Sequence, residues 1–229
     1  MYLHFNIFVS AGIWTTTAFV NLSALYASFS LLIRIELSGL GQILFRDGLQ
    51  NNFYRAVTAH GLGMVFLFIM PGIISAMGNL HIPTLLGCVD FATPRLNNLA
   101  FWLSVLATQL LVVSLAFEAG LSAGWTLYFP LTGSDFSSGA SVSLGILSLH
   151  LLGASSEAGA ITFLATLQMS RNAGIPSLSW DLVAWAIFVI SILLLTTLPI
   201  LGAGITVLFF ERHFGFSGLS GLGLDSAGD

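Results

Sequence analysis

Five apolar segments, each long enough to cross a bilayer as a helix, dominate this sequence at roughly 5–35, 52–87, 96–117, 141–170 and 181–211. A transmembrane helix needs about 20 consecutive, mainly apolar residues, and these runs lack the strict alternation of a membrane β-barrel. Only 7% of the 229 residues are charged, whereas soluble domains carry about 25%. The sequence therefore predicts an all-α, polytopic bundle of about five transmembrane helices.

We expect residues 1–229 to form a single membrane domain. The Gly/Ser-rich stretch 213–229 is typical of a flexible tail, and Pro71-Gly72 predicts a bend within the second segment. All six basic residues are Arg, and the basic patch that nucleic-acid binding needs is missing. Nucleic acid is therefore not an expected partner.

Polar side chains inside an apolar helix are costly, so each one is a candidate for function. His60 lies near the start of the second segment, where an imidazole can ligate iron, relay a proton or bond a neighbouring helix. Two small residues beside it, Gly61 and Gly63, leave space for the edge of a flat macrocycle. The interhelical hydrogen bond is the commoner role of a lone membrane histidine, and spacing alone leaves the three roles open.

Other polar positions have a structural interpretation beside a functional one. Arg34, at the end of the first segment, can either extend its side chain to the membrane interface or contact a ligand. Asp90 can pair with Arg95 or cap the next helix, and Trp125 suits an interfacial aromatic belt. The hydroxyls of the fourth segment either line a water path or bond their own helix backbone; they belong to Ser155, Ser156 and Thr162.

Long motifs occur in a fixed order along the chain. They are TAH at 58–60, MP at 70–71, GN at 78–79, GCVDFATPRLNNLAFW at 87–102, EAGLSAGWTLYFPLTG at 118–133, GASVSLGILSLHLLGASSEAGAITF at 139–163 and LPILGAGITVLFFER at 198–212. The series resembles subunit 1 of the haem–copper terminal oxidases, the cytochrome c oxidase family, from about Leu31 to Arg212. Chance similarity among apolar helices does not produce such a series.

The resemblance implies a haem site that this chain carries in part. His60, the histidine of TAH, would be one axial ligand of the low-spin haem a, whose iron passes electrons without binding oxygen. Arg34 resembles the Arg that bonds the haem a formyl group, and Trp125 would lie by the haem propionates. Glu36 and Gly41 keep the spacing of the family's peripheral Ca²⁺ or Na⁺ site, without the usual Gln-Pro between them.

The resemblance also implies a proton path. Asp90 matches the aspartate at the mouth of the family's D path, and the polar residues along that path match Asn79, Asn97, Ser155 and Ser156. Thr162 stands where the family has Asn, and Glu157 replaces an apolar residue. We therefore expect proton conduction through surroundings of altered polarity.

The family fold has about twelve helices, and this sequence covers five of them. One of six expected metal-binding histidines lies here, so the haem a3 and copper ligands are expected on a partner chain. The resemblance thus implies a split subunit that is inactive alone. We assign His150 to an interhelical hydrogen bond, and the remaining histidines to surface or interface positions; these are His4, His81 and His213.

The predicted function is that of a proton-pumping enzyme subunit, which reduces oxygen to water with electrons from cytochrome c. Expected partners are the carboxy-terminal fragment, oxidase subunits 2 and 3, accessory subunits, cytochrome c and membrane lipids. The lysine-free, apolar composition favours the mitochondrial inner membrane over a bacterial plasma membrane. A quinol oxidase of the same superfamily is one alternative. A non-catalytic scaffold or transporter is another, although it should not retain TAH, LLIR and the Asp90 region together.

Overall fold

The computed structural model describes eight stretches of the chain, and all regular structure within them is helical. These stretches are 24–39, 43–45, 50–88, 90–117, 120–134, 136–137, 139–170 and 180–214. The all-α prediction is therefore confirmed for the described part of the chain.

The helices follow one another with short connections. Residues 24–36 are helical, and after them come α2 (Gln50–Leu62), the π-helix η1 (Gly63–Met77), α3 (Gly78–Leu86), α4 (Pro94–Ala116), α5 (Ser141–Met169) and α6 (Leu182–Phe214). The elements α2, η1 and α3 join without a break. Since α6 continues to Phe214, it extends two residues into the stretch that the sequence predicts as a tail; residues 215–229 lie outside the described part.

Within the described residues, four helices are long and apolar enough to cross a membrane. They are Asn51–Leu86, Pro94–Ala116, Ser141–Met169 and Leu182–Phe214. Four of the five predicted segments are thereby confirmed, with bounds that differ by a few residues. The fifth, the first segment of the chain, is helical at 24–36, and its earlier part lies outside the described residues.

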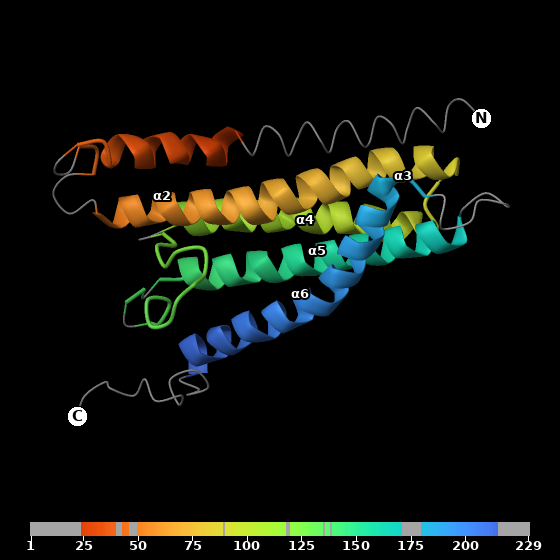
Figure 1. The fold of residues 1–229 in the computed structure, drawn as a ribbon. Coiled ribbons are helices and arrows are strands. Elements are labelled where there is room, and N and C mark those ends of the chain that lie inside the picture. The colour runs from red at the N-terminus through yellow and green to blue at the C-terminus, as the bar shows by residue number, and fades with distance from the viewer. Residues whose placement is uncertain are drawn as a thin grey trace.

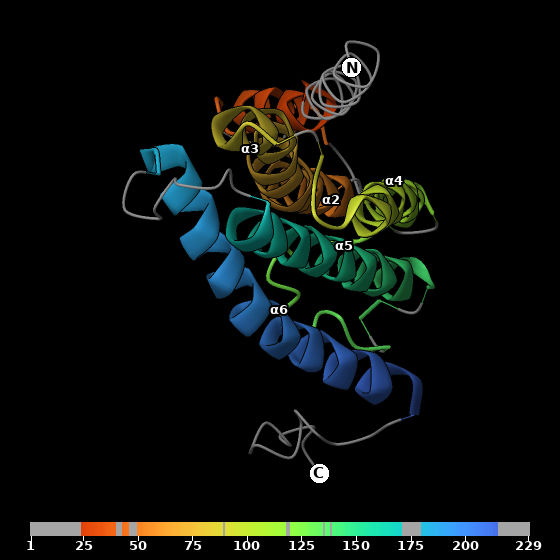
Figure 2. The ribbon, with the colours of Figure 1, turned by 90° about the vertical axis from the view of Figure 1, so that its right-hand side faces the viewer.

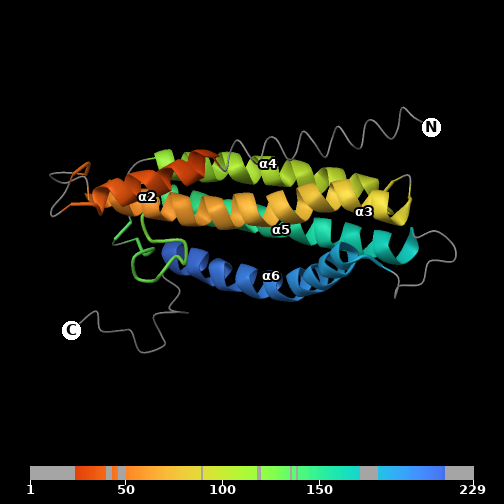
Figure 3. The same cartoon turned by 45° about the horizontal axis from the view of Figure 1, so that its top comes forward.

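The helices form an elongated bundle with two distinct ends (Figure 1). At the Ser141 end, α2 and α5 begin, while α4, α6 and the helix 24–36 finish. At the Asp90 end, α3 and α5 finish, while α4 and α6 begin. Figure 2 shows α5 between α4 and α6, with α6 crossing it obliquely. The helix 24–36 lies along α2 in Figure 3 as well as in Figure 1.

The second span changes its winding around Pro71, where the sequence predicts a bend. Proline has no N–H to donate, and its ring collides with the carbonyl four residues earlier in an α-helix. The chain adopts π-helical winding over Gly63–Met77, in which each hydrogen bond spans five residues instead of four. It returns to α-helix at Gly78.

Two apolar clusters hold the described helices together. The larger joins α2, η1, α4, α5 and α6 through side chains such as Leu62, Leu111 and Ile146, each with 0% exposure. The smaller lies at the Asp90 end, where Ile82 of α3 packs with Phe163 of α5 and other apolar residues. Each cluster therefore supports one end of the bundle, where the candidate residues lie.

Candidate functional site

His60 is half-buried on α2 and is oriented by the neighbouring helix. Its Nδ1 lies 3.0 Å from the backbone carbonyl oxygen of Tyr26, on the helix 24–36. Because a carbonyl oxygen only accepts hydrogen bonds, Nδ1 carries the proton and Nε2 keeps a free lone pair. Within the described residues no hydrogen bond engages Nε2. This is the arrangement of a histidine that binds a metal through one nitrogen and is held in position through the other.

The glycines beside His60 are filled by side chains rather than left open. A Cβ on Gly61 would lie 2.9 Å from the Cβ of Trp125, and one on Gly63 would collide with the ring of Tyr26. The space beside these two glycines is therefore occupied by Trp125 and Tyr26. The glycines instead allow Trp125 and the helix 24–36 to approach α2 closely.

Arg34 and Trp125 lie on elements adjacent to His60 without contacting it by a hydrogen bond. Arg34 is exposed near the carboxyl end of the helix 24–36, eight residues beyond Tyr26. Eight helical residues span about 12 Å, which carries Arg34 toward the Ser141 end. Trp125 is 50% exposed. Trp125 therefore combines a Cβ packed on Gly61 with an exposed ring, whereas Arg34 is exposed.

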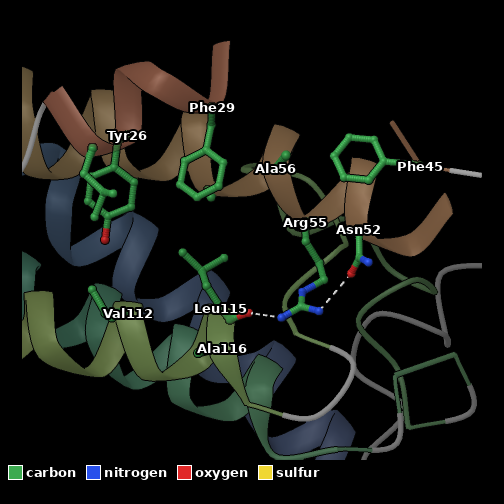
Figure 4. Close-up of a pocket in the computed structure, with 11 residues that line it drawn as sticks. Tyr26, Phe29, Phe45, Asn52, Arg55, Ala56, Val112, Leu115 and Ala116 are labelled. Carbon is green, nitrogen blue, oxygen red and sulfur yellow. Dashed lines mark hydrogen bonds between the residues drawn. The ribbon is translucent and has the colours of Figure 1, made fainter. Parts of the chain in front are cut away.

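A cavity of about 440 Å³ lies between the helix 24–36, α2 and α4 (Figure 4). Its wall is mostly apolar, and its polar side is formed by Arg55, which donates to the Leu115 carbonyl and, at 3.0 Å, to Asn52 Oδ1. The buried Tyr26 hydroxyl, also in the wall, has no hydrogen-bond partner among the described residues. His60 is not part of the lining, so this cavity is separate from the face of Nε2.

Polar contacts join α5 to α4 at intervals of seven residues. Ser148 Oγ donates to the Ala107 carbonyl and Ser155 Oγ donates to the Ala100 carbonyl, both at 2.6 Å. One step further, Thr93 Oγ1 donates to Thr162 Oγ1 at 3.1 Å. Seven residues are two helical turns, so these groups share one face of α5. Thr162 Oγ1 also donates to the Ala158 carbonyl of its own helix at 2.9 Å, and the place of Ser155 and Thr162 on a proton path stays a prediction.

The loop at the Asp90 end gathers further polar groups. Asp90 is half-buried, and its Oδ1 accepts from the Phe91 N–H at 2.6 Å. Asn97 Nδ2 donates to Asn79 Oδ1 at 3.1 Å, which joins α4 to α3. Ser156, next to Ser155 on α5, makes no hydrogen bond within the described residues.

The two structural alternatives for Asp90 are not observed. The first residue before α4 is Thr93, and no side chain caps this helix end. No ion pair joins Asp90 to Arg95 in the described part of the chain. The carboxylate therefore remains available for another role.

The candidate Ca²⁺ or Na⁺ position lies only partly within the described residues. The Glu36 carboxylate accepts backbone N–H bonds at 2.6 Å from Leu44 and at 3.3 Å from Ile43 and Phe45. Gly41 lies outside the described residues. No group of three or more metal-binding side chains occurs in the part of the chain that the structure describes.

The other described histidines bond within the bundle. His150 Nε2 lies 2.8 Å from Thr206 Oγ1 on α6, which confirms the predicted interhelical bond. His213 Nε2 lies 2.8 Å from Ser143 Oγ on α5, and His81 Nδ1 lies 2.9 Å from the Met77 carbonyl. His4 lies outside the described residues.

Sequence reasoning missed several groups that the structure brings into the site. The Tyr26 carbonyl carries no signal, because any residue could supply a backbone acceptor. The hydroxyls of Ser148 and Thr93 could have been found, since Ser148, Ser155 and Thr162 are spaced by seven residues in the sequence. Thr166 joins them, because its Oγ1 accepts from the Ala92 N–H at 3.1 Å.

Comparison with known proteins places these observations in a family context. The family model described as Cytochrome C and Quinol oxidase polypeptide I matches residues 10–226. Cytochrome c oxidase subunit 1 of Candida albicans is 43% identical over 193 residues, covering 84% of this chain and 36% of the relative. The Yarrowia lipolytica subunit is 44% identical (82% and 35%), and the Mytilus edulis subunit is 41% identical (82% and 34%). The chain thus spans about a third of the length of these relatives.

Proposed function

The chain belongs to the cytochrome c and quinol oxidase polypeptide I family, and from this premise we propose that it forms the amino-terminal part of the catalytic subunit of a cytochrome c oxidase. The three named relatives, all subunits of cytochrome c oxidase, support cytochrome c rather than a quinol as the electron donor. The activity is that of a membrane complex that reduces oxygen to water and moves protons. This chain alone does not perform it.

The orientation of His60 is the observation that carries the proposal. Its Nδ1–H bond to the Tyr26 carbonyl leaves the Nε2 lone pair free of partners in the described residues, and the residue lies in the TAH motif. An imidazole fixed in this way would donate its Nε2 lone pair to haem iron. When bound, a low-spin haem a would supply one-electron transfer. The task of His60 is to hold that group on a rigid transmembrane element.

Two further residues would adjust the surroundings of the haem. Arg34 carries a permanent positive charge at the exposed end of its helix, and a charge-assisted bond from it to the haem formyl would change the haem potential. Trp125 packs on Gly61, the residue after His60, and would border the propionates. Arg34 belongs to the helix 24–36, whereas Trp125 is held against α2 by this packing and by the bond from the Gly124 N–H to Thr58 Oγ1 at 3.0 Å.

The Asp90 end would serve as the proton entrance. The half-buried Asp90 would take up protons, and the polar groups that follow it into the bundle would orient water molecules along α4 and α5. These groups are Asn79, Asn97, Thr93, Thr162, Ser155 and Ser156. Asp90 precedes α4 at one end of the bundle, whereas the helix 24–36, which carries Arg34, finishes at the other end (Figure 1). Protons taken up at Asp90 would thus enter from the side of the membrane opposite to Arg34.

The remaining parts of the enzyme lie beyond these 229 residues. We propose that the haem a3 and copper ligands come from the rest of the subunit, on the same or a second polypeptide. Subunits 2 and 3, accessory subunits and lipids would complete the complex in the mitochondrial inner membrane. Glu36 and Gly41 would contribute to a peripheral Ca²⁺ or Na⁺ site. Residues 1–229 would act within it as a single membrane domain.

Replacement of His60 tests the proposal. In the purified complex, His60→Ala should abolish the low-spin haem a band in the reduced-minus-oxidised spectrum and the oxidation of cytochrome c. His81→Ala is the matched control, because His81 also bonds a backbone carbonyl through Nδ1 but lies on α3 at the other end of the bundle. It should keep the haem band and turnover.

A normal haem a band in the His60→Ala complex would contradict the proposal. Turnover with a quinol in place of cytochrome c would show that the family assignment holds while the donor is wrong. Mass spectrometry of the same preparation identifies the polypeptide that carries the other metal ligands.

A further inference from the structure

The helix α5 has a second polar face, which the proposed proton path does not use. Ser143, His150 and Glu157 are spaced by seven residues, so they lie on one side of the helix. Ser143 bonds His213, and His150 bonds Thr206, each across 2.8 Å. This face is therefore directed at α6, whereas Ser148, Ser155 and Thr162 contact α4 or the loop before it.

The contacts with α6 follow an antiparallel register. One step of seven residues along α5, from Ser143 to His150, matches a step of seven backward along α6, from His213 to Thr206. The next step pairs Glu157 with Pro199. Proline has no N–H and no polar side-chain atom, so the residue at this position offers Glu157 no hydrogen-bond donor.

A cavity of about 200 Å³ lies between α5 and α6 at the level of Glu157 and Pro199. Glu157 and Pro199 both line it, together with His150, Gly202 and apolar side chains of η1 and α6. Among the described residues in its wall, Glu157 and His150 are the two with ionisable side chains. The cavity has room for several water molecules, and each water needs polar partners of this kind.

Glu157 lies close to the middle of the membrane-length helix α5, which spans Ser141–Met169. Its side chain is half-buried and makes no hydrogen bond or ion pair within the described residues. An ionised carboxylate in such surroundings is costly unless a cation or hydrogen-bond donors stabilise it. A bound proton removes the charge and that cost.

We propose that this cavity is a proton-binding site, in which Glu157 holds an exchangeable proton inside the membrane and shares it with His150 through water. The ligand is a proton in a small water cluster. The site does not depend on haem binding by His60, and it lies on the opposite face of α5 from the path that begins at Asp90. It is therefore additional to the proposed function.

His150 is suited to take part because its partners accommodate both protonation states. Its Nδ1 lies 2.9 Å from the Ile146 carbonyl and thus carries a proton. With neutral His150, the Thr206 hydroxyl donates to Nε2. With protonated His150, Nε2–H donates to Thr206 Oγ1, and the hydroxyl turns to the Gly202 carbonyl 2.7 Å away.

The exchange step is balanced and involves no redox change. The Glu157 O–H bond breaks, a proton moves along the water molecules to Thr206 Oγ1, and the hydroxyl passes its own proton to His150 Nε2, where an N–H bond forms. The products are a carboxylate and an imidazolium in one cavity, whose opposite charges attract each other. The return step restores both neutral groups. Seven helical residues separate the two side chains by about 10 Å along the axis, so water is required between them.

Chemical labelling of the intact complex tests the protonation of Glu157. Dicyclohexylcarbodiimide, an apolar carbodiimide, adds the O–H of a protonated carboxyl group across its C=N bond: a C–O bond forms and the proton moves to nitrogen. Peptide mass spectrometry should find the adduct on Glu157 at neutral pH and less of it at alkaline pH. Asp181, exposed at the start of α6, is the control and should remain unlabelled. No adduct on Glu157 at any pH would overturn the proposal.

Infrared spectroscopy of the same complex supplies an independent measurement. The wild type should show the carbonyl-stretch band of a protonated carboxylic acid, which shifts in D₂O and is lost on raising the pH. The band should be lost in Glu157→Gln and kept in Asp181→Asn, and His150→Gln should move the pH at which it disappears. A band unaffected by Glu157→Gln contradicts the site. An ionised Glu157 at neutral pH in the wild type does so as well and indicates an ion pair with another helix. If Glu157→Gln does not assemble, the labelling of the wild type decides alone.

Discussion

The negative charge of Asp90 affects a second side chain, the thiol of Cys88, whose reactivity can be measured separately. Burial raises the pKa of this thiol, the negative charge of Asp90 raises it further, and a backbone hydrogen bond opposes them. Because the thiolate is the reactive form of cysteine, Cys88 should react slowly at neutral pH. Cys88 is the single cysteine of the chain, so its reactivity reports on the Asp90 loop alone.

Asp90→Asn should accelerate alkylation of Cys88 by iodoacetamide. The substitution removes a charge that raises the thiol pKa, so more thiolate exists at a given pH. Peptide mass spectrometry of the complex after timed alkylation at pH 8 measures the rate. Proton uptake in the same variant should fall while the haem spectra stay unchanged. An equal or slower alkylation rate would show that the carboxylate and the thiol do not interact.

For single residues, the sequence could predict the position along a helix but not the orientation of the side chain. The position of His60 on a transmembrane helix followed from the apolar run and the TAH motif. Its orientation did not, because it depends on the Tyr26 carbonyl, 34 residues away, and a backbone acceptor leaves no trace in the residue type. The same limit explains Gly61 and Gly63: small residues predict close approach, and only the fold shows that Trp125 and Tyr26 make it.

Whole helices were more predictable than the contacts between them. Apolar length fixes each span to within a few residues, because a bilayer demands it. The polar faces of α5 could also be predicted, since residues seven apart share a face. The sequence could not predict which helix each face contacts, because the partners include backbone carbonyls, such as those of Ala100 and Ala107 on α4. Their small side chains allow α5 to approach closely.

Gly78→Ala tests the close packing of the second span against α5. A Cβ at Gly78 would lie 2.7 Å from the Cζ of the fully buried Phe163, so the ring or the helix must move. Such overpacking typically costs about 1–3 kcal/mol. The melting temperature of the detergent-purified complex should fall by several degrees. Gly204→Ala on α6 is the control, because its Cβ would meet no atom within 4 Å. Equal melting temperatures for the two variants would contradict the packing argument.

Across the whole molecule, an arginine on the last helix holds the long loop between α4 and α5. Arg212, near the end of α6, donates to the Thr132 carbonyl at 2.7 Å and also to the Ser137 and Gly139 carbonyls. Three carbonyls from one loop thus converge on one guanidinium, which lies 73 to 80 residues later in the sequence. The loop also carries Trp125, so the end of α6 supports the side of the bundle that faces the proposed haem.

Arg212→Gln should therefore release this loop without disturbing the Asp90 end. Loss of a charged donor leaves carbonyls without a partner, at about 1–3 kcal/mol for each buried group, and a loosened loop is cut more readily by proteases. Limited digestion with chymotrypsin should cleave the variant faster than the wild type beside the exposed Tyr128 and Phe136. Arg95→Gln is the matched control, because Arg95 is exposed on α4 and makes no hydrogen bond or ion pair to the described residues; it should be cut at the wild-type rate. If the Arg212→Gln and Arg95→Gln complexes are cleaved equally slowly, the loop is held by its apolar contacts, such as that between Leu121 and Gly145, and the guanidinium adds little.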